Sequence, residues 1–262
     1  MEPILEIYNT LKERYEYYLT LRDERVKNWP LIESPLPMIY LVIGYLAFVL
    51  VGMKYMKNRK PLELKYPMIF HNLLCALISA YMTFETLYQA YINNYSFVCN
   101  PVDYSETGIG MAKILWLFYF SKSIEFMDTV FMILRGKLNQ VTFLHVYHHS
   151  SIFFLWWIGV NWTAGGDAYL SAAVNSFVHT VMYTYYLLAA LKIQPWWKKY
   201  LTQLQLAQFV LNVGTSIYVL SQDCPFPRWM MWAMIVYMAQ MLLLFGSFYL
   251  GAYITKPKKK TQ

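Results

Sequence analysis

The sequence predicts an all-α integral membrane protein with seven transmembrane helices. Of its 262 residues, 58% are hydrophobic and only 14% are charged, whereas soluble domains carry about 25% charged residues. The apolar residues form seven runs, and each run reaches the roughly 20 residues that cross a ~30 Å hydrocarbon layer. Basic residues gather between these runs, as in membrane proteins, so the net charge of +7 does not indicate nucleic-acid binding.

Three regions divide the predicted chain. Residues 1–36 carry seven acidic and five basic side chains, with no cleavable signal peptide, and are predicted to form a helix near residues 3–25 on the membrane surface. Residues 37–252 form the transmembrane domain, and residues 253–262 form a basic cytosolic tail. The predicted transmembrane helices cover residues 37–56, 67–90, 111–134, 141–160, 168–190, 200–221 and 229–252.

The distribution of Lys and Arg predicts the orientation. The connections after the first, third and fifth transmembrane helices, with the tail, hold fourteen such residues, and the opposite connections hold only Arg228. By the positive-inside rule the fourteen are cytosolic, which places the N-terminus in the lumen and the C-terminus in the cytosol. The five basic residues of the N-terminal segment oppose this orientation. The fourteen are Lys54, Lys57, Arg59, Lys60, Lys65, Arg135, Lys137, Lys192, Lys198, Lys199, Lys256, Lys258, Lys259 and Lys260.

Two cysteines fall on the predicted lumenal side. Cys99 follows the second transmembrane helix and Cys224 follows the sixth. In the oxidising lumen of the endoplasmic reticulum they are expected to form a disulfide, with two separate free thiols as the alternative.

The C-terminal tail carries two lysines at the third and fourth positions from the end, Lys260 and Lys259. This dilysine resembles a retrieval signal of the endoplasmic reticulum, which is the predicted location. Attraction of a basic tail to anionic lipid is the alternative.

The third transmembrane helix carries four polar side chains on one face. Lys122, Glu125, Asp128 and Thr129 stand at i, i+3, i+6 and i+7, a spacing that aligns them on a helix. A lysine with two carboxylates can neutralise its charge internally and face the bundle interior. This face is predicted to belong to a functional site, with a structural ion-pair network as the alternative.

The fourth transmembrane helix holds three of the five histidines. His145, His148 and His149 stand at i, i+3 and i+4, which aligns them on one helical face. Ionisable side chains at membrane depth are costly, so this face indicates a functional site. A further histidine, His71 in the second helix, has no obvious partner and is predicted to be structural.

The fifth and sixth helices add further polar faces, made of Asn175, His179, Tyr183, Gln205 and Gln208. At about 1.5 Å per residue, the polar side chains of four consecutive helices lie about 8–16 Å from their cytosolic ends. Contacts that only join helices need not share one layer, whereas the walls of one chamber must. The sequence therefore predicts a polar chamber reached from the cytosol, with apolar space beyond it for a long apolar tail.

The histidine pattern admits metal binding or metal-free chemistry. Membrane di-iron enzymes use several histidine boxes, whereas this chain has five histidines. One zinc ion on three histidines is an alternative, but His148 and His149 point about 100° apart around the helix. No metal is therefore expected. A neutral imidazole is the best nucleophile left, because Cys75 lies in the second helix, outside the polar faces.

Four motifs in this order resemble the fatty-acid elongase family, the membrane condensing enzymes of very-long-chain fatty acid synthesis. They are Lys122-Ser-Ile-Glu125-Phe-Met-Asp128-Thr129 for K-x-x-E-x-x-D-T, His145-Val-Tyr-His148-His149 for H-x-x-H-H, His179-Thr-Val-Met182-Tyr183 for H-x-x-M-Y, and Gln205-Leu-Ala-Gln208 for Q-x-x-Q. The resemblance covers nearly the whole chain. Val102-Asp-Tyr-Ser105 and Trp156-Trp-Ile-Gly159 look most like the animal branch that acts on very-long-chain and polyunsaturated acyl-CoAs.

The resemblance implies a fold and a reaction. The fold has seven transmembrane helices, six of which form a barrel around an acyl tunnel. The reaction condenses a long-chain acyl-CoA with malonyl-CoA to 3-oxoacyl-CoA, carbon dioxide and CoA, with no bound cofactor, because NADPH belongs to separate reductases. The expected partners are the endoplasmic reticulum membrane, a second copy in a homodimer, and the reductases and dehydratase of the elongation cycle.

Each candidate residue has an expected role. His148 attacks the thioester and carries the acyl group as an acyl-imidazole, while His179 positions the substrate carbonyl or handles the proton. His145 and His149 orient and tune His148. The other candidates are Lys122, Glu125 and Asp128 for the local field, Asn175, Tyr183, Gln205 and Gln208 as donors to an enolate or oxyanion, and Lys198 and Lys199 for the CoA phosphates.

Two other functions share parts of this pattern. A di-iron lipid desaturase or hydroxylase would contain stoichiometric iron, which metal analysis of the purified protein detects. A proton-coupled seven-span transporter would not release carbon dioxide from malonyl-CoA.

Overall fold

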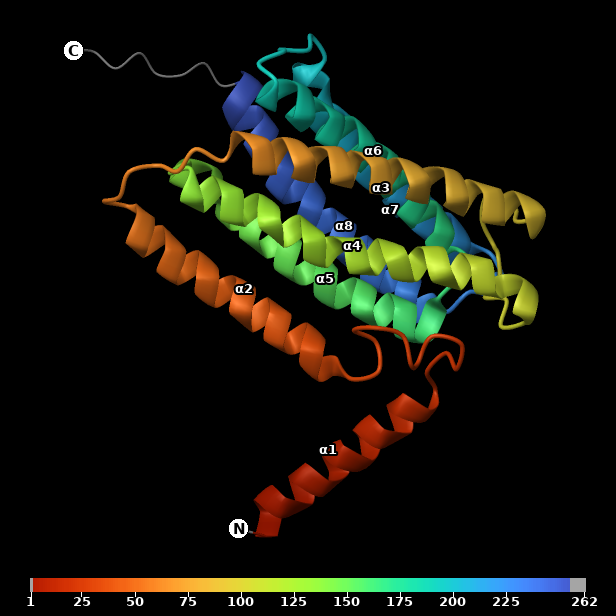
Figure 1. Cartoon of the computed structure of the whole chain (residues 1–262). Helices are drawn as coiled ribbons and strands as arrows, with labels where there is room; N and C mark the ends of the chain where they lie inside the picture. The colour runs from red at the N-terminus through yellow and green to blue at the C-terminus, as the bar shows by residue number, and fades with distance from the viewer. Residues whose placement is uncertain (1, 255–262) are drawn as a thin grey trace.

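The structure, a computed structural model, describes residues 2–254 and the side chains of residues 5–198 and 200–254. This part of the chain is all-helical (Figure 1). Its α-helices are α1 (Glu2–Thr20), α2 (Pro35–Met56), α3 (Lys65–Ile92), α4 (Ile109–Leu134), α5 (Phe143–Thr163), α6 (Ala168–Ala190), α7 (Lys198–Ser221) and α8 (Arg228–Tyr249). Short 3-10 turns at Glu106–Gly108 and Leu138–Gln140 and a π-helical turn at Leu250–Ile254 complete the elements.

Helices lie at all seven positions predicted for transmembrane helices, from α2 to α8. Local chemistry explains several boundaries. Ser34 accepts a hydrogen bond from the Leu36 amide before α2, and Thr142 accepts one from the His145 amide before α5. Gly136 adopts a φ of 67° directly after α4, a left-handed conformation that glycine takes without strain.

Four stretches of the described chain are long and apolar enough to span a bilayer, namely Pro35–Met56, Lys65–Ile92, Tyr200–Ser221 and Arg228–Ile254. Large apolar side chains on these helices point outward, such as Leu50, Phe84 and Leu243, each more than 70% exposed. This surface is typical of a multi-pass membrane protein. The other three helices, α4, α5 and α6, carry the predicted charged and histidine side chains, which lower their hydropathy.

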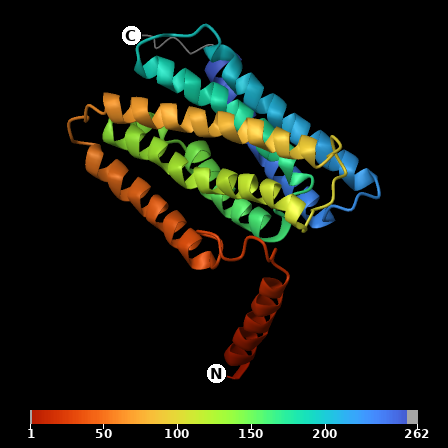
Figure 2. The same ribbon diagram turned by 45° about the vertical axis from the view of Figure 1, so that its right-hand side comes forward.

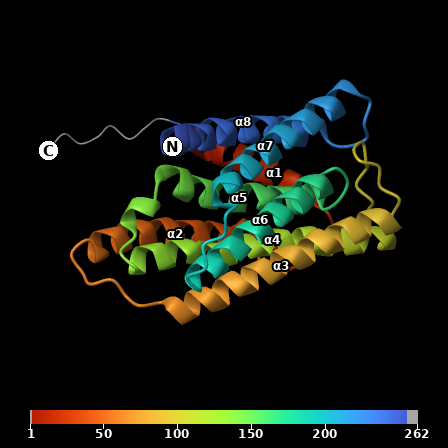
Figure 3. The ribbon, with the colours of Figure 1, turned by 90° about the horizontal axis from the view of Figure 1, so that it is seen from above.

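Six helices contact each other in a closed ring. Following the contacts, the order is α3, α4, α5, α8, α7, α6 and back to α3, and α4 also touches α6 across the ring. The α2 helix lies outside this ring against α4 and α5 (Figures 1 and 3).

Consecutive helices from α2 to α8 run in alternating directions, so their connections gather at two ends (Figures 1 and 2). The basic end contains connections 57–64, 135–142 and 191–197. The disulfide end contains connections 93–108, 164–167 and 222–227, and there Cys99 is bonded to Cys224 as predicted. Asp167 tightens this end, since its carboxylate accepts bonds from the Cys99 amide and from the Asn100 amide and side chain. Burial raises the pKa of Asp167, and these three hydrogen bonds act in the opposite direction.

The N-terminal segment has two parts. The α1 helix projects away from the bundle, and it ends at Thr20 rather than near the predicted residue 25 (Figures 1 and 2). Residues 21–34 instead form a loop that docks on the disulfide end, with Val26 and Ile32 fully buried. Arg25 in this loop pairs with Asp23 at 2.5 Å and donates to the backbone carbonyl of Asp103. One of the basic residues that opposed the predicted orientation is therefore neutralised by a neighbour.

Candidate functional site

The charged face of α4 forms a buried ion pair. Lys122 Nζ lies 2.8 Å from Glu125 Oε1, and both side chains are at most 3% exposed. Lys122 also donates to Asn175 Oδ1 on α6 at 3.2 Å. Of the two carboxylates expected to neutralise Lys122, Glu125 pairs with it, and Asn175 from the neighbouring helix is its other partner.

Glu125 also contacts His179 on α6. His179 Nδ1 lies 3.2 Å from Glu125 Oε1, which is within ion-pair distance but without hydrogen-bond geometry. This buried nitrogen is left with no hydrogen-bond partner among the described residues. Buried polar atoms are nearly always paired, so an unpaired one in a polar cluster is a candidate contact for a substrate.

Asp128 belongs to a different group from Lys122 and Glu125. Tyr183 donates to Asp128 Oδ2 at 2.7 Å, and His71 Nε2 lies 2.9 Å from Asp128 Oδ1. Cys75 Sγ lies 3.6 Å from the same nitrogen of His71.

These contacts contradict two predictions from the sequence. His71 is not without a partner, and Cys75 is not outside the polar constellation. The reason is the close packing of α3 against α6 and α4, which brings the second transmembrane helix to the site. The depth of each residue along its helix would have indicated this contact. At about 1.5 Å per residue, His71 and Asp128 both lie about 9 Å from the basic end.

His145 joins a third group through Thr129. Its Nε2 atom lies 2.8 Å from Thr129 Oγ1, which also lies 3.0 Å from the hydroxyl of Tyr45 on α2. The His145 and His149 rings are 4.4 Å apart. A helix outside the ring therefore also contacts the site, through a tyrosine that the sequence did not indicate.

His148 faces α8 rather than α4 or α6. Its Nδ1 atom lies 3.2 Å from the hydroxyl of Tyr237, which in turn lies 3.1 Å from Ser151 Oγ. Nothing in the sequence indicated Tyr237 as a site residue, because this tyrosine stands in an apolar run without polar periodicity.

The remaining candidates lie at the edges of the cluster. Gln208 on α7 is buried, and Gln205 Nε2 lies 3.8 Å from the sulfur of Met182. Lys198 is exposed at the basic end, where it lines an open depression together with Lys192. Lys199 belongs to α7, but its side chain lies outside the part that the structure describes.

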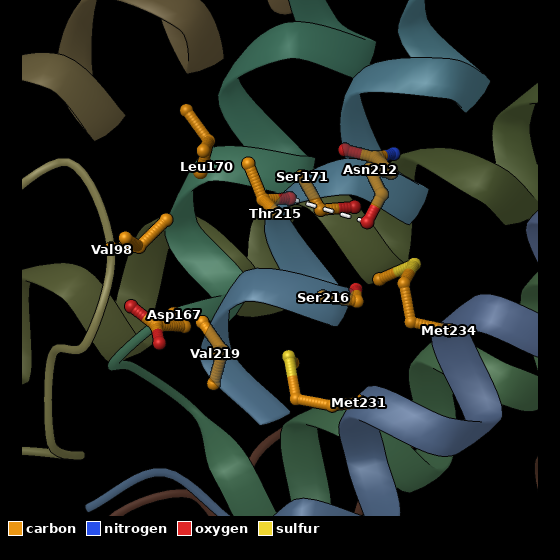
Figure 4. A pocket seen from close by; sticks show the side chains of 10 residues that line it. All are labelled: Val98, Asp167, Leu170, Ser171, Asn212, Thr215, Ser216, Val219, Met231 and Met234. Atoms are coloured by element: carbon orange, nitrogen blue, oxygen red, sulfur yellow. Dashed lines mark hydrogen bonds between the residues drawn. The ribbon is translucent and has the colours of Figure 1, made fainter. Parts of the chain in front are cut away.

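A small cavity lies toward the disulfide end, between α6, α7 and α8 (Figure 4). Its volume is about 20 Å³, roughly the space of one water molecule. Its walls mix the polar side chains of Ser171, Asn212 and Ser216 with the thioethers of Met231 and Met234. The cavity and the histidine layer share α6: Ser171 lines the cavity near the start of this helix, and His179 lies about two turns further toward the basic end.

The arrangement combines imidazoles, buried charge and hydrogen-bond donors in one layer. Four histidines lie in the basic-end half of the bundle, and each has a different contact. Such a set can perform acid–base chemistry or form a covalent imidazole adduct. Among the described residues, no group of three or more His, Cys, Asp or Glu side chains is arranged to hold a metal ion.

Comparison with known proteins adds a family and several relatives. The pattern of the family described as ELO: GNS1/SUR4 family matches residues 30–261. The chain is 44% identical to very long chain fatty acid elongase 4 of Macaca mulatta, over 97% of this chain and 82% of that protein. It is 43% identical to very long chain fatty acid elongase 2 of Mus musculus, over 91% and 83%. It is 39% identical to very long chain fatty acid elongase 5 of Xenopus tropicalis, over 94% and 84%.

Proposed function

The chain belongs to the ELO: GNS1/SUR4 family, and on this basis we propose that it is the condensing enzyme of fatty-acid elongation. It joins a long-chain acyl-CoA to malonyl-CoA and releases 3-oxoacyl-CoA, carbon dioxide and CoA. The observation that carries this function is the layer of four histidines, two buried and two partly buried, beside the buried Lys122–Glu125 pair, in a chain whose relatives are named elongases. Condensation involves no net oxidation, so the proposal needs no redox cofactor.

The proposed architecture has seven transmembrane helices, with six in a barrel around an acyl tunnel. The closed contact ring of α3 to α8, with α2 outside, supports this arrangement. The acyl-CoA enters from the basic end, and the acyl tail extends toward the cavity near the disulfide.

The proposed first step acylates His148. The Nε2 lone pair forms a bond to the thioester carbon, and the C–S electron pair leaves with the CoA sulfur, which then takes a proton from solvent. Malonyl-CoA next loses carbon dioxide, and the resulting enolate carbon attacks the acyl carbon. The C–N electron pair returns to Nε2, which restores the neutral imidazole.

The other site residues stabilise charge around this reaction. The unpaired Nδ1 of His179 lies at the ion pair and is placed to contact the substrate carbonyl. Lys122 and Glu125 fix the position of Asn175 and His179. Asp128 holds Tyr183, His145 and His149 pack beside His148, and Gln205 and Gln208 border the layer as donors to an enolate oxygen.

The proposed location is the endoplasmic reticulum membrane, with the N-terminus in the lumen and the C-terminus in the cytosol. The Cys99–Cys224 disulfide supports an oxidising compartment on its side. The basic end then faces the cytosol, where Lys192 and Lys198 are positioned to contact CoA phosphates. The predicted retrieval signal, Lys259 and Lys260, lies outside the described residues. A homodimer and contacts with the elongation-cycle reductases and dehydratase are further expectations for this location.

The test is intact-mass analysis of purified protein incubated with acyl-CoA alone. We expect an added acyl mass in the wild type and none in His148→Ala, together with loss of labelled malonyl-CoA incorporation by at least about a hundredfold. A His148→Ala protein that still forms the adduct would refute the assignment of the nucleophile. Stoichiometric iron in the protein, with no release of carbon dioxide from malonyl-CoA, would favour the desaturase or hydroxylase alternative.

A further inference from the structure

A chain of hydrogen bonds runs from His148 away from the polar layer. His148 Nδ1 lies 3.2 Å from the Tyr237 hydroxyl, and this hydroxyl lies 3.1 Å from Ser151 Oγ. Ser151 Oγ lies 2.6 Å from the backbone carbonyl oxygen of Tyr147. Tyr237 comes from α8 and is 6% exposed, so the chain joins α5 to α8 in the bundle interior.

The last contact determines where every hydrogen lies. A carbonyl oxygen only accepts, so the hydrogen between Ser151 and Tyr147 belongs to the Ser151 hydroxyl. Ser151 has one hydrogen, and it must therefore accept from Tyr237. Tyr237 likewise has one hydrogen, so its oxygen must accept from the Nδ1–H group of His148.

This assignment selects one tautomer of His148. A neutral imidazole carries a single N–H, and here the network places it on Nδ1. The Nε2 atom then keeps its lone pair. In the reverse tautomer Nδ1 carries a lone pair, so either the His148–Tyr237 contact or another contact of this network would lack a hydrogen.

The hydrogen-bond partner of His148 is a neutral hydroxyl, whereas two other histidines contact carboxylates. His71 contacts a carboxylate, Asp128, and His179 lies beside another, Glu125. A carboxylate stabilises the protonated imidazolium, which has no lone pair for attack. His148 instead has a neutral hydroxyl partner, an arrangement that favours a nucleophile over a proton acceptor.

We propose that Tyr237 and Ser151 are positioning residues that hold His148 as the Nδ1–H tautomer with Nε2 free to attack. This inference rests on the proposed function, because it explains how the proposed acyl carrier is prepared. When Nε2 becomes acylated, the ring gains positive charge, and the Nδ1–H···O bond to Tyr237 strengthens without a proton leaving the ring. Neither residue belongs to the four motifs of the sequence.

Three variants of the full-length protein test the proposal. Tyr237→Phe removes the acceptor and keeps the ring. Ser151→Ala keeps the Tyr237 hydroxyl but frees it to turn and donate to Nδ1, which moves the histidine proton to Nε2. Tyr147→Phe is the matched control, since it removes another hydrogen bond between α5 and α8, from Tyr147 to Gln240 at 2.6 Å, and leaves the Tyr147 backbone carbonyl in place.

Two measurements separate the outcomes. The rate of acyl-enzyme formation from acyl-CoA should fall by about tenfold to a hundredfold in Tyr237→Phe and Ser151→Ala, the size seen when the orienting partner of a functional histidine is lost, with KM unchanged. Nitrogen-15 NMR of histidine-labelled protein, with the His148 signal identified from His148→Ala, should show Nδ1 protonated in the wild type and in Tyr147→Phe. Tyr237→Phe and Ser151→Ala should both lose the signal of protonated Nδ1.

The proposal would be overturned if Tyr237→Phe and Ser151→Ala both acylated at the wild-type rate. It would also be overturned if the control Tyr147→Phe slowed acylation as much as they do. A wild-type His148 protonated on Nε2 would also overturn it. If the wild type forms no acyl-enzyme, the nucleophile role under the proposed function fails, while the NMR signature still decides the tautomer.

Discussion

The four clustered histidines differ in their contacts. His145 lies against Thr129, His148 against Tyr237 and His179 against Glu125, while His149 packs between the first two rings. Residues that share a motif therefore differ in their surroundings. Their chemistry depends on whether the neighbour is a hydroxyl, a carboxylate or another imidazole.

The pair His71 and Cys75 allows a sharp test at the residue scale. His71→Phe removes a hydrogen bond to the Asp128 carboxylate, a type of bond worth about 1.5–3 kcal/mol, so we expect elongation to fall by at least about tenfold. Cys75→Ala leaves the His71–Asp128 bond in place and should keep elongation close to wild type. Both are measured as labelled malonyl-CoA incorporation at equal protein levels. An inactive Cys75→Ala protein that no longer forms the acyl adduct would point to the thiol instead of His148.

At the scale of elements, α4 connects the site. Its polar residues contact different helices: Lys122 contacts α6, Asp128 contacts α3 and α6, and Thr129 contacts α2 and α5. These contacts reach beyond the structural ion-pair network that was the alternative interpretation of this face. Because each turn of α4 binds a different neighbour, the helix sets the relative positions of four others.

The start of α6 offers a second test. Asp167→Ala leaves the Cys99 and Asn100 amides without their acceptor, and an unsatisfied buried donor costs about 1–3 kcal/mol. We expect the apparent melting temperature in detergent to fall by several degrees. Asp223→Ala, an exposed carboxylate in the neighbouring connection, is the control and should melt like the wild type. Equal melting of the two variants would show that the Asp167 contacts do not hold this end together.

At the scale of the whole molecule, the basic residues and the cavity lie toward opposite ends of the bundle. Lys192 and Lys198 lie at the basic end, and the cavity of Figure 4 lies toward the disulfide end. The histidine layer lies between them. A substrate with an anionic head and an apolar tail fits this order of features.

Removing a lysine at the basic end should weaken the binding of acyl-CoA. Lys192→Ala and Lys198→Ala should each raise the KM for acyl-CoA by about twofold to fivefold with little change in kcat, as for exposed ion pairs. The increase should shrink at high salt because screening weakens the wild-type contact. Lys54→Ala removes the same charge from α2, outside the ring, and should not change KM. A similar rise in Lys54→Ala would indicate a general charge effect.

Filling the cavity between α6, α7 and α8 should shorten the longest product. Ser216→Phe places a ring in the space between α6, α7 and α8, so the longest product should become shorter in a panel of acyl-CoA substrates. Ile217→Phe on the exposed face of the same helix is the control. An unchanged product distribution in Ser216→Phe would place the acyl tail elsewhere.

The sequence by itself determined which segments are helices, which ends carry the basic residues, and which motif residues form the polar layer. These properties depend on local periodicity and composition, which one chain displays directly. It also indicated the Cys99–Cys224 disulfide, because both cysteines follow helices that end on the same side.

Only the tertiary structure decided which residues touch. His71, Tyr45 and Tyr237 reach the site from α3, α2 and α8, three helices in which the sequence had indicated no site residue. Helix-to-helix contacts depend on how side chains interdigitate, and residue spacing within one helix carries no information about its neighbour. For that reason the order of the ring and the partner of each histidine became visible only after the helices were packed.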